Sequence, residues 1–350
     1  MILKCNFEIK YGLGIVPIEK VTEFCYLETM ISSDRLFRRE TRAITELPSY
    51  LEENNVKVKD IYISGFSENP PICENDGIDL DLLIVVISAP NNHNKRQAIR
   101  QTWGHFTMRR EVSIAFFIGN ISDNEINNKI EKEQILYEDI IRFNSYNSMN
   151  HVLKTVAMLE WVHIFCSEAK FLLKTNDNVF VNVFKLLVLI PRLNQTDRAV
   201  YGKLESNWTI SGIENSSIFP DFTIGPSYLI PINLCEELFL AALKHSYIRW
   251  EDIFLTGLVA DALGIKRIHI STFVNLRLPA TSCNVQKAIS LLVEEDIEQY
   301  DLWKVLHDLM PVMVKCDFHE ENITFIEMTS TIKKHRLNYL LEDLESTYLK

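Results

Sequence analysis

The chain contains 350 residues, of which 47% are hydrophobic and 24% are charged, and its formal net charge at pH 7 is −11. This length and composition are typical of a globular protein with one large α/β domain or two smaller ones. The acidic balance argues against nonspecific binding to nucleic acid and against peripheral attachment to acidic lipid, since both need an excess of Lys and Arg. We therefore expect no nucleic-acid partner.

The cysteines and glycosylation sequons bear on the cellular compartment. The cysteines lie far apart, without a CxxC pair or a zinc-like spacing, which argues against structural zinc. Sequons of the N-x-S/T type are only slightly more frequent than chance predicts for so Asn-rich a chain, so they support a secretory route weakly. No apolar stretch is long enough to span a bilayer, and the N-terminus lacks a signal-peptide core. Either the protein is cytosolic or this chain lacks its targeting segment.

Predicted helices and strands begin after an N-terminal region of mixed character. Residues 1–72 are expected to form an appendage of unclear order, in which Val56–Gly65 alternates like a strand. From Leu80 onward, segments of strand length alternate with helical segments, which indicates βαβ crossovers and a mostly parallel sheet. We expect strands at Leu80–Ile87, Val112–Gly119, Asp139–Phe143 and Phe171–Thr175, and helices at Lys95–Trp103, Asn124–Leu136, Val152–Phe165, Val183–Ile190, Pro231–Leu243 and Asp252–Gly264. The C-terminal part looks helical and acidic.

The segment FLLKTNDNVFVN, residues 171–182, combines a buried strand with a polar end. Asn176, Asp177 and Asn178 would project oxygen-bearing side chains outside the carboxyl end of that strand, where open α/β sheets bind ligands. Oxygen ligands at such an edge suit a hard divalent cation that also holds phosphate. The alternative is an Asx-rich turn that joins the strand to the next element.

Two arginines, Arg96 and Arg100, are spaced i,i+4 in KRQAIRQTW, on one face of the helix that follows the first strong strand. Two guanidiniums there can clamp a diphosphate through bidentate hydrogen bonds. The alternative is a solvated basic face. Trp103 can stack on a base or fill the core, and the core is the favoured interpretation.

Adjacent carboxylates precede the apolar helix that begins near Asp252. Glu251 and Asp252 can raise one another's pKa, and an acid poised in this way can act as general base toward a hydroxyl. The alternative is that acidic residues simply favour the first turn of a helix. Gly225 lies between aromatic residues in FPDFTIGPSY, which fits either a substrate-lining loop or an ordinary turn.

Taken in order, four segments resemble the β-1,3-galactosyltransferase family (glycosyltransferase family 31), which includes β-1,3-N-acetylglucosaminyltransferases. They are SAPNNHNKRQAIRQTW, FLLKTNDNVFVNV, FPDFTIGPSYLI and WEDIFLTG, and SNW at Ser206–Trp208 adds a fifth, shorter match. The resemblance covers about residues 73–305. It implies an N-terminal appendage at 1–72, a GT-A domain at 73–305 and a helical extension at 306–350. The GT-A domain would be α/β, with a mostly parallel central sheet flanked by helices.

The resemblance also implies an activity and a set of site residues. A hexose (galactose or N-acetylhexosamine) would pass from a UDP-sugar to a glycan hydroxyl on protein or lipid, by an inverting displacement that forms a β-1,3 linkage. Asp252 would be the catalytic base. The donor would contact Arg96, Arg100, Trp103, Lys174, Asn176 and Asp177, and the acceptor Trp208, Gly225, Tyr228 and Glu251. Family members are usually Golgi membrane proteins with a lumenal catalytic domain, and a disulfide between Cys73 and Cys166 would fit that compartment. No oligomeric state is implied.

Departures from the family pattern concern the metal. The family's three aspartates are Asn176, Asp177 and Asn178 in this chain, so an amide stands at the position of the direct ligand. A family histidine corresponds to Leu292, which cannot ligate. Asp177 and Asn178 are therefore expected to bind Mn²⁺ or Mg²⁺ weakly, because hard cations prefer carboxylates. The alternative function is a catalytically inactive GT-A domain that binds a glycan or a protein partner.

Overall fold

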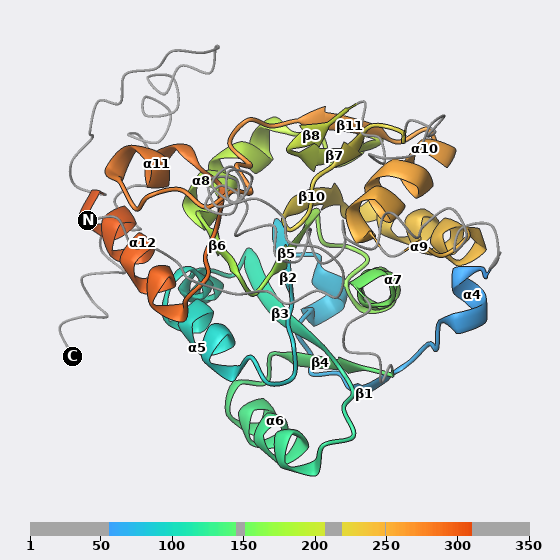
Figure 1. Ribbon diagram of the computed structural model, residues 1–350, viewed down its shortest axis with the longest axis horizontal. Coiled ribbons are helices and arrows are strands. Elements are labelled where there is room, and N and C mark those ends of the chain that lie inside the picture. The colour runs from blue at the N-terminus through green and yellow to red at the C-terminus, as the bar shows by residue number, and fades with distance from the viewer. Residues whose placement is uncertain (1–55, 145–150, 207–218, 249, 310–350) are drawn as a thin grey trace, which may run out of the picture.

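The computed structural model describes residues 56–144, 151–206, 219–248 and 250–309. An eight-stranded sheet lies at its centre, in the order β1-β4-β3-β2-β5-β10-β7-β11 (Figure 1). These strands are β1 (Phe66–Glu68), β2 (Leu82–Ile87), β3 (Val112–Gly119), β4 (Ile140–Phe143), β5 (Phe171–Asn176), β7 (Ala199–Gly202), β10 (Tyr228–Pro231) and β11 (Lys266–His269). Two small sheets pair β6 (Val179–Val181) with β12 (Ser290–Leu292) and β8 (Leu204–Glu205) with β9 (Phe222–Thr223).

Most strands of the central sheet run in one direction. The neighbours β4, β3, β2 and β5 pair in parallel, and so do β7 and β11. Only β1 and β10 run the other way, because β1 is antiparallel to β4 and β10 is antiparallel to both β5 and β7. The mostly parallel sheet expected from the alternating pattern is confirmed. The central strands β2 and β3 are almost entirely apolar because both of their faces are covered.

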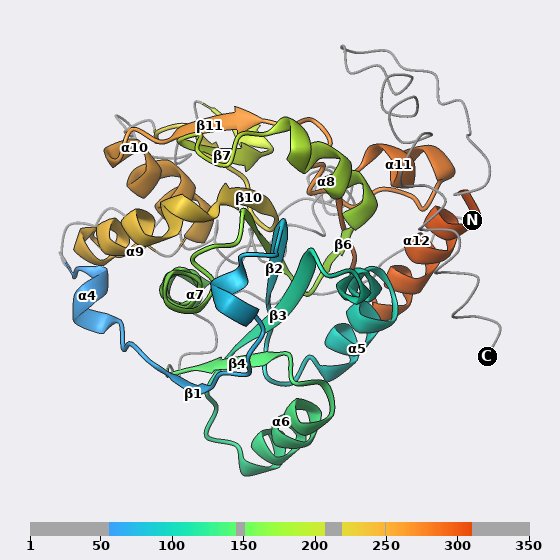
Figure 2. The same ribbon diagram turned by 180° about the vertical axis from the view of Figure 1, so that it is seen from behind.

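Helices cover both faces of this sheet, as the views from the two sides show (Figures 1 and 2). The helices are α4 (Val58–Ile61), α5 (His93–Gln101), α6 (Asn124–Tyr137), α7 (His151–Phe165), α8 (Val183–Leu189), α9 (Cys235–Lys244), α10 (Ala260–Ala262), α11 (Ser282–Lys287) and α12 (Asp296–Leu309). On one face, α7 and α9 pack on a core that includes Trp161 and Leu238. On the other, α5 and α12 pack around Trp103 and Leu302.

One local expectation is wrong. The strand-like alternation of Val56–Gly65 corresponds to one helical turn, α4, whose Val58 is fully buried. The helix expected from Pro231 is confirmed, because a 3-10 turn (Ile232–Leu234) follows Pro231 and α9 continues it. Pro231 is also the last residue of β10 and lies opposite Phe171 of β5.

The segment before residue 73 is tied to the sheet and to α7. Tyr62 and Ser64 donate hydrogen bonds to the two carboxylate oxygens of Glu160 on α7, at 2.6 and 2.5 Å, and β1 pairs with β4. A disulfide joins Cys73 to Cys166 at the end of α7, as the resemblance implied. The sheet therefore starts before residue 73, and at the other end α12 continues across the proposed boundary at 305/306.

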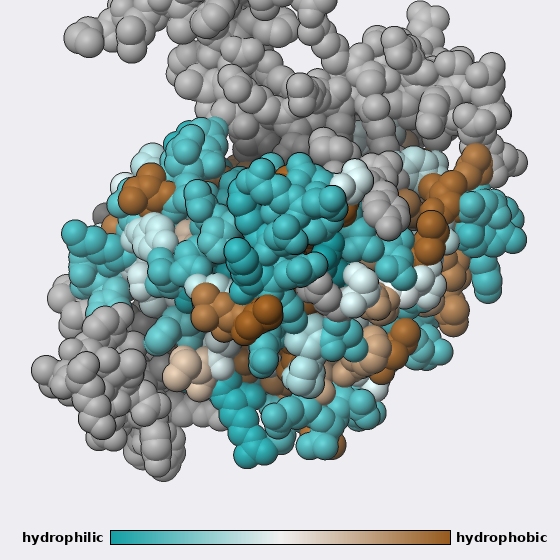
Figure 3. All heavy atoms as spheres, turned by 90° about the horizontal axis from the view of Figure 1, so that it is seen from below, coloured by the Kyte–Doolittle hydropathy of each residue, from teal (hydrophilic) through white to brown (hydrophobic). Residues whose placement is uncertain are grey.

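The side of the molecule that carries α6 is mainly hydrophilic, with separate hydrophobic side chains rather than one continuous patch (Figure 3). Ile135 and Leu136, near the end of α6, are among the large apolar residues exposed to solvent. Within the described ranges, no helix has the length and apolar character needed to cross a membrane.

Candidate functional site

Two segments far apart in sequence meet at one edge of the central sheet. Strand β5 ends at Asn176, and β10 runs antiparallel beside it with Tyr228 opposite Lys174. The start of β10 therefore lies where β5 ends. The polar triplet at 176–178 and the loop around Gly225 share this edge, which is where open α/β sheets bind ligands.

The carboxylate pair at 251–252 is held against this edge by hydrogen bonds. Oε2 of Glu251 accepts a hydrogen bond from Nζ of Lys174 at 2.7 Å, and Oε1 accepts one from the Tyr228 hydroxyl. Oδ2 of Asp252 accepts a hydrogen bond from the backbone N–H of Gly225 at 3.1 Å. A Cβ at position 225 would lie 3.5 Å from Oε2 of Glu251 and 3.7 Å from Oδ2 of Asp252. The loop backbone at Gly225 therefore lies directly beside both acids, although a Cβ there would make only ordinary van der Waals contacts.

This environment makes Asp252 a weaker acid than usual. Burial raises its pKa to about 6, and the negative charge of Glu251 acts in the same direction. Hydrogen bonds from the N–H groups of Ile253 and Gly225, together with the Lys174 charge, oppose that rise. At neutral pH Asp252 is still mainly ionised, and its pKa lies close enough to neutral pH for it to take up and release a proton.

The loop that contacts Asp252 has its own support. Nδ2 of Asn275 donates to the carbonyl oxygens of Ile224 and Ser227, at 3.0 and 2.9 Å, on either side of the Gly225–Pro226 pair. Asn275 has a φ of +52°, which asparagine tolerates better than most residues. The sequence analysis missed Asn275 because it lies in an irregular segment without a motif.

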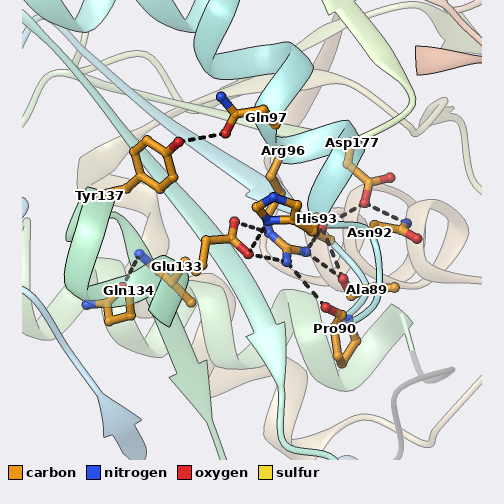
Figure 4. Close-up of polar contacts among 12 residues, drawn as sticks. Ala89, Pro90, Asn92, His93, Arg96, Gln97, Glu133, Gln134, Tyr137 and Asp177 are labelled. Atoms are coloured by element: carbon orange, nitrogen blue, oxygen red, sulfur yellow. Dashed lines mark hydrogen bonds and ion pairs between the residues drawn. The ribbon is translucent and has the colours of Figure 1, made fainter. Parts of the chain in front are cut away.

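Asp177 is anchored on the other side of β5, at the end of β2 (Figure 4). Its Oδ2 accepts hydrogen bonds from Oγ of Ser88 at 2.7 Å and from Nδ2 of Asn92 at 2.8 Å. The guanidinium of Arg96 in turn donates to Oγ of Ser88 and to the carbonyl oxygen of Ala89. Residues 177 and 178 form the turn that joins β5 to β6, as the alternative interpretation predicts, and a buried hydrogen-bond network fixes Asp177 within it.

The arginine clamp expected for a diphosphate is wrong. Arg96 has no exposed surface and donates two hydrogen bonds to Glu133, at 2.8 and 2.7 Å. Arg100 makes a bidentate pair with Asp139 and a further ion pair with Glu133. Protein carboxylates use both guanidiniums, so neither is available to a ligand. The solvated basic face, the alternative, is wrong as well, because Arg96 is fully buried and only 10% of the Arg100 side chain is exposed.

Glu133 is the centre of this network. Burial alone would raise its pKa, but the hydrogen bonds and charge of Arg96, together with His93 and Arg100, lower it to about 2. Trp103 is also absent from the site: it has no exposed surface, and its Nε1 donates to Gln299 of α12 at 3.0 Å. The core interpretation of Trp103 is correct, and its assignment to the donor is wrong.

A cluster of basic side chains faces the same edge from α7. Lys154 is only 3% exposed, and burial lowers its pKa to about 8, with Asp177 opposing and Lys174 reinforcing that shift. Burial, Lys154 and Lys174 likewise lower the pKa of His151 to about 4, against the charges of Glu251 and Asp177. The charges of Asp177 and Glu251 thus both act on His151. The sequence analysis missed His151 and Lys154, whose only signal is polar residues inside an apolar helix.

The residues expected to hold a metal do not fit a hard divalent cation. Asp177 is the only carboxylate of the triplet, and its Oδ2 already accepts two hydrogen bonds. Oδ1 of Asn176 is buried without a hydrogen-bond partner, but one amide oxygen is a poor ligand set for a hard cation, which prefers carboxylates. Leu292 lies in β12, opposite Val179. In the described part of the chain, no three His, Cys, Asp or Glu residues are grouped to hold a metal.

The remaining predicted residues fall into two groups. Lys174, Asn176 and Asp177 lie at the end of β5, while Gly225, Tyr228 and Glu251 lie around Asp252. Trp208 lies outside the described residues. Tyr228 has no exposed surface, so its part in the site is to hold Glu251.

Comparisons with known proteins identify the family to which this sequence is similar. A family model described as galactosyltransferase matches residues 94–271. The chain is 26% identical over 268 residues to β-1,3-galactosyltransferase 1 of Homo sapiens, covering 71% of this chain and 81% of that protein. It is 28% identical over 244 residues to β-1,3-galactosyltransferase 5 of Homo sapiens, a match that covers 65% of this chain and 78% of that protein. A similar solved structure is the galactosyltransferase LgtC with donor and acceptor sugar analogs, at 10% identity and a TM-score of 0.36, covering 67% of this chain and 98% of that one.

The mostly parallel sheet, the carboxylate pair at its edge and the family match define a glycosyltransferase. The family model covers more than half of the chain, from residue 94 to residue 271. This chain belongs to the galactosyltransferase family, and its curated relatives are β-1,3-galactosyltransferases.

Proposed function

We propose that the protein transfers a hexose, either galactose or an N-acetylhexosamine, from a UDP-sugar to a glycan hydroxyl in β-1,3 linkage. The acceptor glycan is carried by a glycoprotein or a glycolipid. The family and the names of the curated relatives support this class of reaction. The single observation that carries the proposal is the position of Asp252, held by Gly225 beside Glu251 and Lys174 at the sheet edge where β5 ends.

In this proposal the reaction is a single displacement at the anomeric carbon. Asp252 takes the proton of the acceptor hydroxyl while that oxygen bonds to the anomeric carbon. The bond between this carbon and the UDP oxygen breaks, and its electron pair leaves with the diphosphate. Because attack and departure occur on opposite faces, the anomeric configuration inverts. The raised pKa of Asp252 suits a base that works near neutral pH.

The neighbours of Asp252 position it in this proposal. Glu251 keeps a negative charge beside Asp252 and is itself fixed by Lys174 and Tyr228. Gly225 provides an N–H donor that fixes one oxygen of Asp252. In this proposal Tyr228 acts through Glu251, and Gly225 and Glu251 line the acceptor side.

We assign this activity to the Golgi lumen, where family members work. The disulfide between Cys73 and Cys166 supports this assignment, because disulfides persist in oxidising compartments of the secretory route. Cys166 is fully buried in the core that α7 covers, and Cys73 packs against that core. The disulfide is therefore a structural one.

Substitution of the proposed base tests the function. Asp252→Asn keeps the size of the side chain but cannot accept the hydroxyl proton, so transfer should fall about 10³-fold while UDP affinity stays within about twofold. Sugar transfer is measured with UDP-galactose, UDP-N-acetylglucosamine and UDP-N-acetylgalactosamine, and UDP affinity by calorimetry. Asp261→Asn is a matched control, because Asp261 bonds to Arg267 on the surface.

Three outcomes would contradict parts of this proposal. Undiminished transfer by Asp252→Asn would mean that another group is the base. Loss of UDP affinity together with transfer would assign Asp252 a structural role. If the unaltered protein bound UDP but transferred no sugar from any donor to a panel of glycans, the inactive binding module would be the better description.

A further inference from the structure

The loop of residues 224–227 carries an N–H group that binds the proposed base. It joins β9 to β10, and the N–H of Gly225 within it donates to Oδ2 of Asp252 at 3.1 Å. The strands on either side are fixed by the pairing of β9 with β8 and of β10 with β5. The N–H of Ile224 donates to the carbonyl oxygen of Lys203 at 2.8 Å, which fixes the first loop residue. The position of the Gly225 N–H then depends on what holds the rest of the loop.

Asn275 holds both ends of this loop with one side chain. Its Nδ2 donates to the carbonyl oxygen of Ile224 at 3.0 Å and to that of Ser227 at 2.9 Å. These two bonds use both hydrogens of the amide nitrogen and lie on either side of Gly225. Only 4% of Asn275 is exposed, so water has little access to replace them. Loss of this amide would leave two carbonyl oxygens with fewer donors.

Asn275 is itself fixed by β12. Its Oδ1 accepts a hydrogen bond from Oγ of the fully buried Ser290 at 2.7 Å, and its backbone N–H donates to the carbonyl oxygen of Ser290 at 3.2 Å. Strand β12 in turn pairs with β6, which follows the turn at the end of β5. Asparagine also tolerates the φ of +52° at this position better than most residues. The amide is thus a firm link between β12 and the loop of residues 224–227.

We propose that Asn275 is a positioning residue for the base, because it holds the loop so that the Gly225 N–H meets Oδ2 of Asp252. This inference rests on the proposed function, in which Asp252 is the base. Asn275 acts through Gly225 and makes no hydrogen bond of its own to Asp252 among those of the described residues. With the loop in place, Gly225 fixes one oxygen of Asp252 and the N–H of Ile253 fixes the other, so the carboxylate keeps one orientation toward the acceptor hydroxyl.

The charges around Asp252 are separate from the contacts of Asn275. Among the described residues, the titratable groups that act on Asp252 are Glu251, Lys174 and Tyr228. The hydrogen-bond partners of Asn275 are carbonyl oxygens and a serine hydroxyl, all uncharged. An uncharged replacement of Asn275 therefore changes no charge near Asp252 and acts through the position of the loop. A weaker hydrogen bond from the loop N–H should raise the pKa of Asp252, because that bond lowers it in the intact protein.

Asn275→Gly tests this inference, because glycine accepts the positive φ and lacks the amide. The acid limb of kcat should move upward by about half a pH unit, and kcat at pH 7 should fall about tenfold or more. The affinity for UDP, measured by calorimetry, should stay within about twofold, since Asn275 binds the loop beside the base. The pKa of Asp252 is also measured without activity, by NMR titration of ¹³C-labelled aspartate with Asp252→Asn as the assignment.

Two further variants separate positioning from stability. Asn127→Ala removes an amide with similar contacts elsewhere, because its Nδ2 donates to the carbonyl oxygen of Ile121 at 2.8 Å and its Oδ1 accepts from Arg142 at 2.6 Å. Arg142 lies on β4, which β3 and β2 separate from β5. The melting temperature of Asn127→Ala should fall while its acid limb stays in place. Ser290→Ala removes only the hydroxyl that fixes Oδ1 of Asn275, should move the limb upward by a smaller amount, and decides the test if Asn275→Gly does not fold.

The outcomes separate this inference from the proposed function. An unmoved acid limb and an unmoved pKa of Asp252 would overturn the inference, while transfer by the unaltered protein would leave the proposed function intact. A lower melting temperature of Asn275→Gly without either shift, as expected for Asn127→Ala, would likewise overturn it and make Asn275 a structural residue only. A raised pKa of Asp252 in Asn275→Gly, with no sugar transfer by the unaltered protein, would support the positioning and overturn the proposed function.

Discussion

Asp252 owes its chemical character to burial and to the groups around its carboxylate. Burial raises its pKa, and the charge of Glu251 raises it further. Hydrogen bonds from the N–H groups of Ile253 and Gly225 and the charge of Lys174 oppose that rise. The balance leaves its pKa near 6 rather than at its ordinary value of 3.8. A general base must be deprotonated to work, so this shift moves the acid limit of activity upward by about two pH units.

The pH dependence of transfer should reveal this shift. Between about pH 4.5 and 6 the rate should rise with pH, because Asp252 loses its proton in that range, and above about pH 7 it should level off. The measurement is kcat for sugar transfer as a function of pH. A rate that stays constant down to pH 4.5 would show that the base has an ordinary carboxyl pKa.

Glu251→Gln provides the comparison for the pH profile. It removes the negative charge next to Asp252 and frees Lys174, and both changes should move the acid limb toward lower pH. Asp261→Asn, on the surface, should leave the limb where it is. An acid limb that Glu251→Gln does not move would mean that Asp252 is not the titrating group.

The individual residues also show what local spacing can and cannot predict. Glu251 and Asp252 are sequence neighbours, so their proximity was visible in the chain itself. Arg96 and Arg100 were assigned to a ligand because their partners were hidden: Glu133 follows Arg96 by 37 residues, and Asp139 follows Arg100 by 39. An i,i+4 pair of arginines therefore specifies a face of a helix but not what lies opposite that face.

The buried ion network joins α5, α6 and the end of β2 into one unit. Arg96 carries the connection, because it binds Glu133 on α6 and also the loop that positions Asp177 (Figure 4). Breaking a buried ion pair by removing one partner leaves the other charge uncompensated. The network should therefore be necessary both for stability and for the position of Asp177.

Arg96→Met should lower the free energy of unfolding by about 3–5 kcal/mol, because it leaves Glu133 buried with fewer partners. Urea unfolding measures this change. Arg110→Met is the control: Arg110 pairs with Asp79 on the surface, with both side chains exposed, so its loss should cost under about 1 kcal/mol. Equal losses for the two variants would show that the buried network contributes no special stability.

Elements with strong periodicity were predicted well, and those fixed by tertiary contacts were not. The strand Val112–Gly119 has the expected bounds, and α6 and α7 differ from expectation by a residue. Strand β10 escaped prediction because it is short, ends in proline and takes its direction from β5 and β7 rather than from its own residues. The helical turn α4 likewise depends on tertiary contacts, since it packs against α9 and its Val58 is fully buried.

The disulfide between Cys73 and Cys166 holds the molecule together over a long stretch of chain. It closes a loop with a sequence separation of 93 residues, which includes β2, β3 and β4. A cross-link of this length restricts the unfolded chain strongly. The whole central sheet should therefore depend on it.

Replacing both cysteines by alanine should lower stability by about 4 kcal/mol, on the chain-entropy account of disulfides. Thermal unfolding of the purified protein is the measurement. Cys235→Ala is the control, because Cys235 is buried as a free thiol and its replacement costs packing alone. A double variant as stable as Cys235→Ala would show that the cross-link is dispensable.

The reversed direction of β10 has a consequence for how the chain can vary. In an all-parallel sheet, the loops that bind ligands all follow strands. Here the turn at residues 177–178 follows β5, whereas the loop around Gly225 precedes β10, and both lie at the same edge of the sheet. On the proposed assignment, the nucleotide is recognised by early parts of the chain and the receiving sugar by later ones. Sequence drift in the later parts can then redirect the enzyme to a new glycan while nucleotide recognition is preserved.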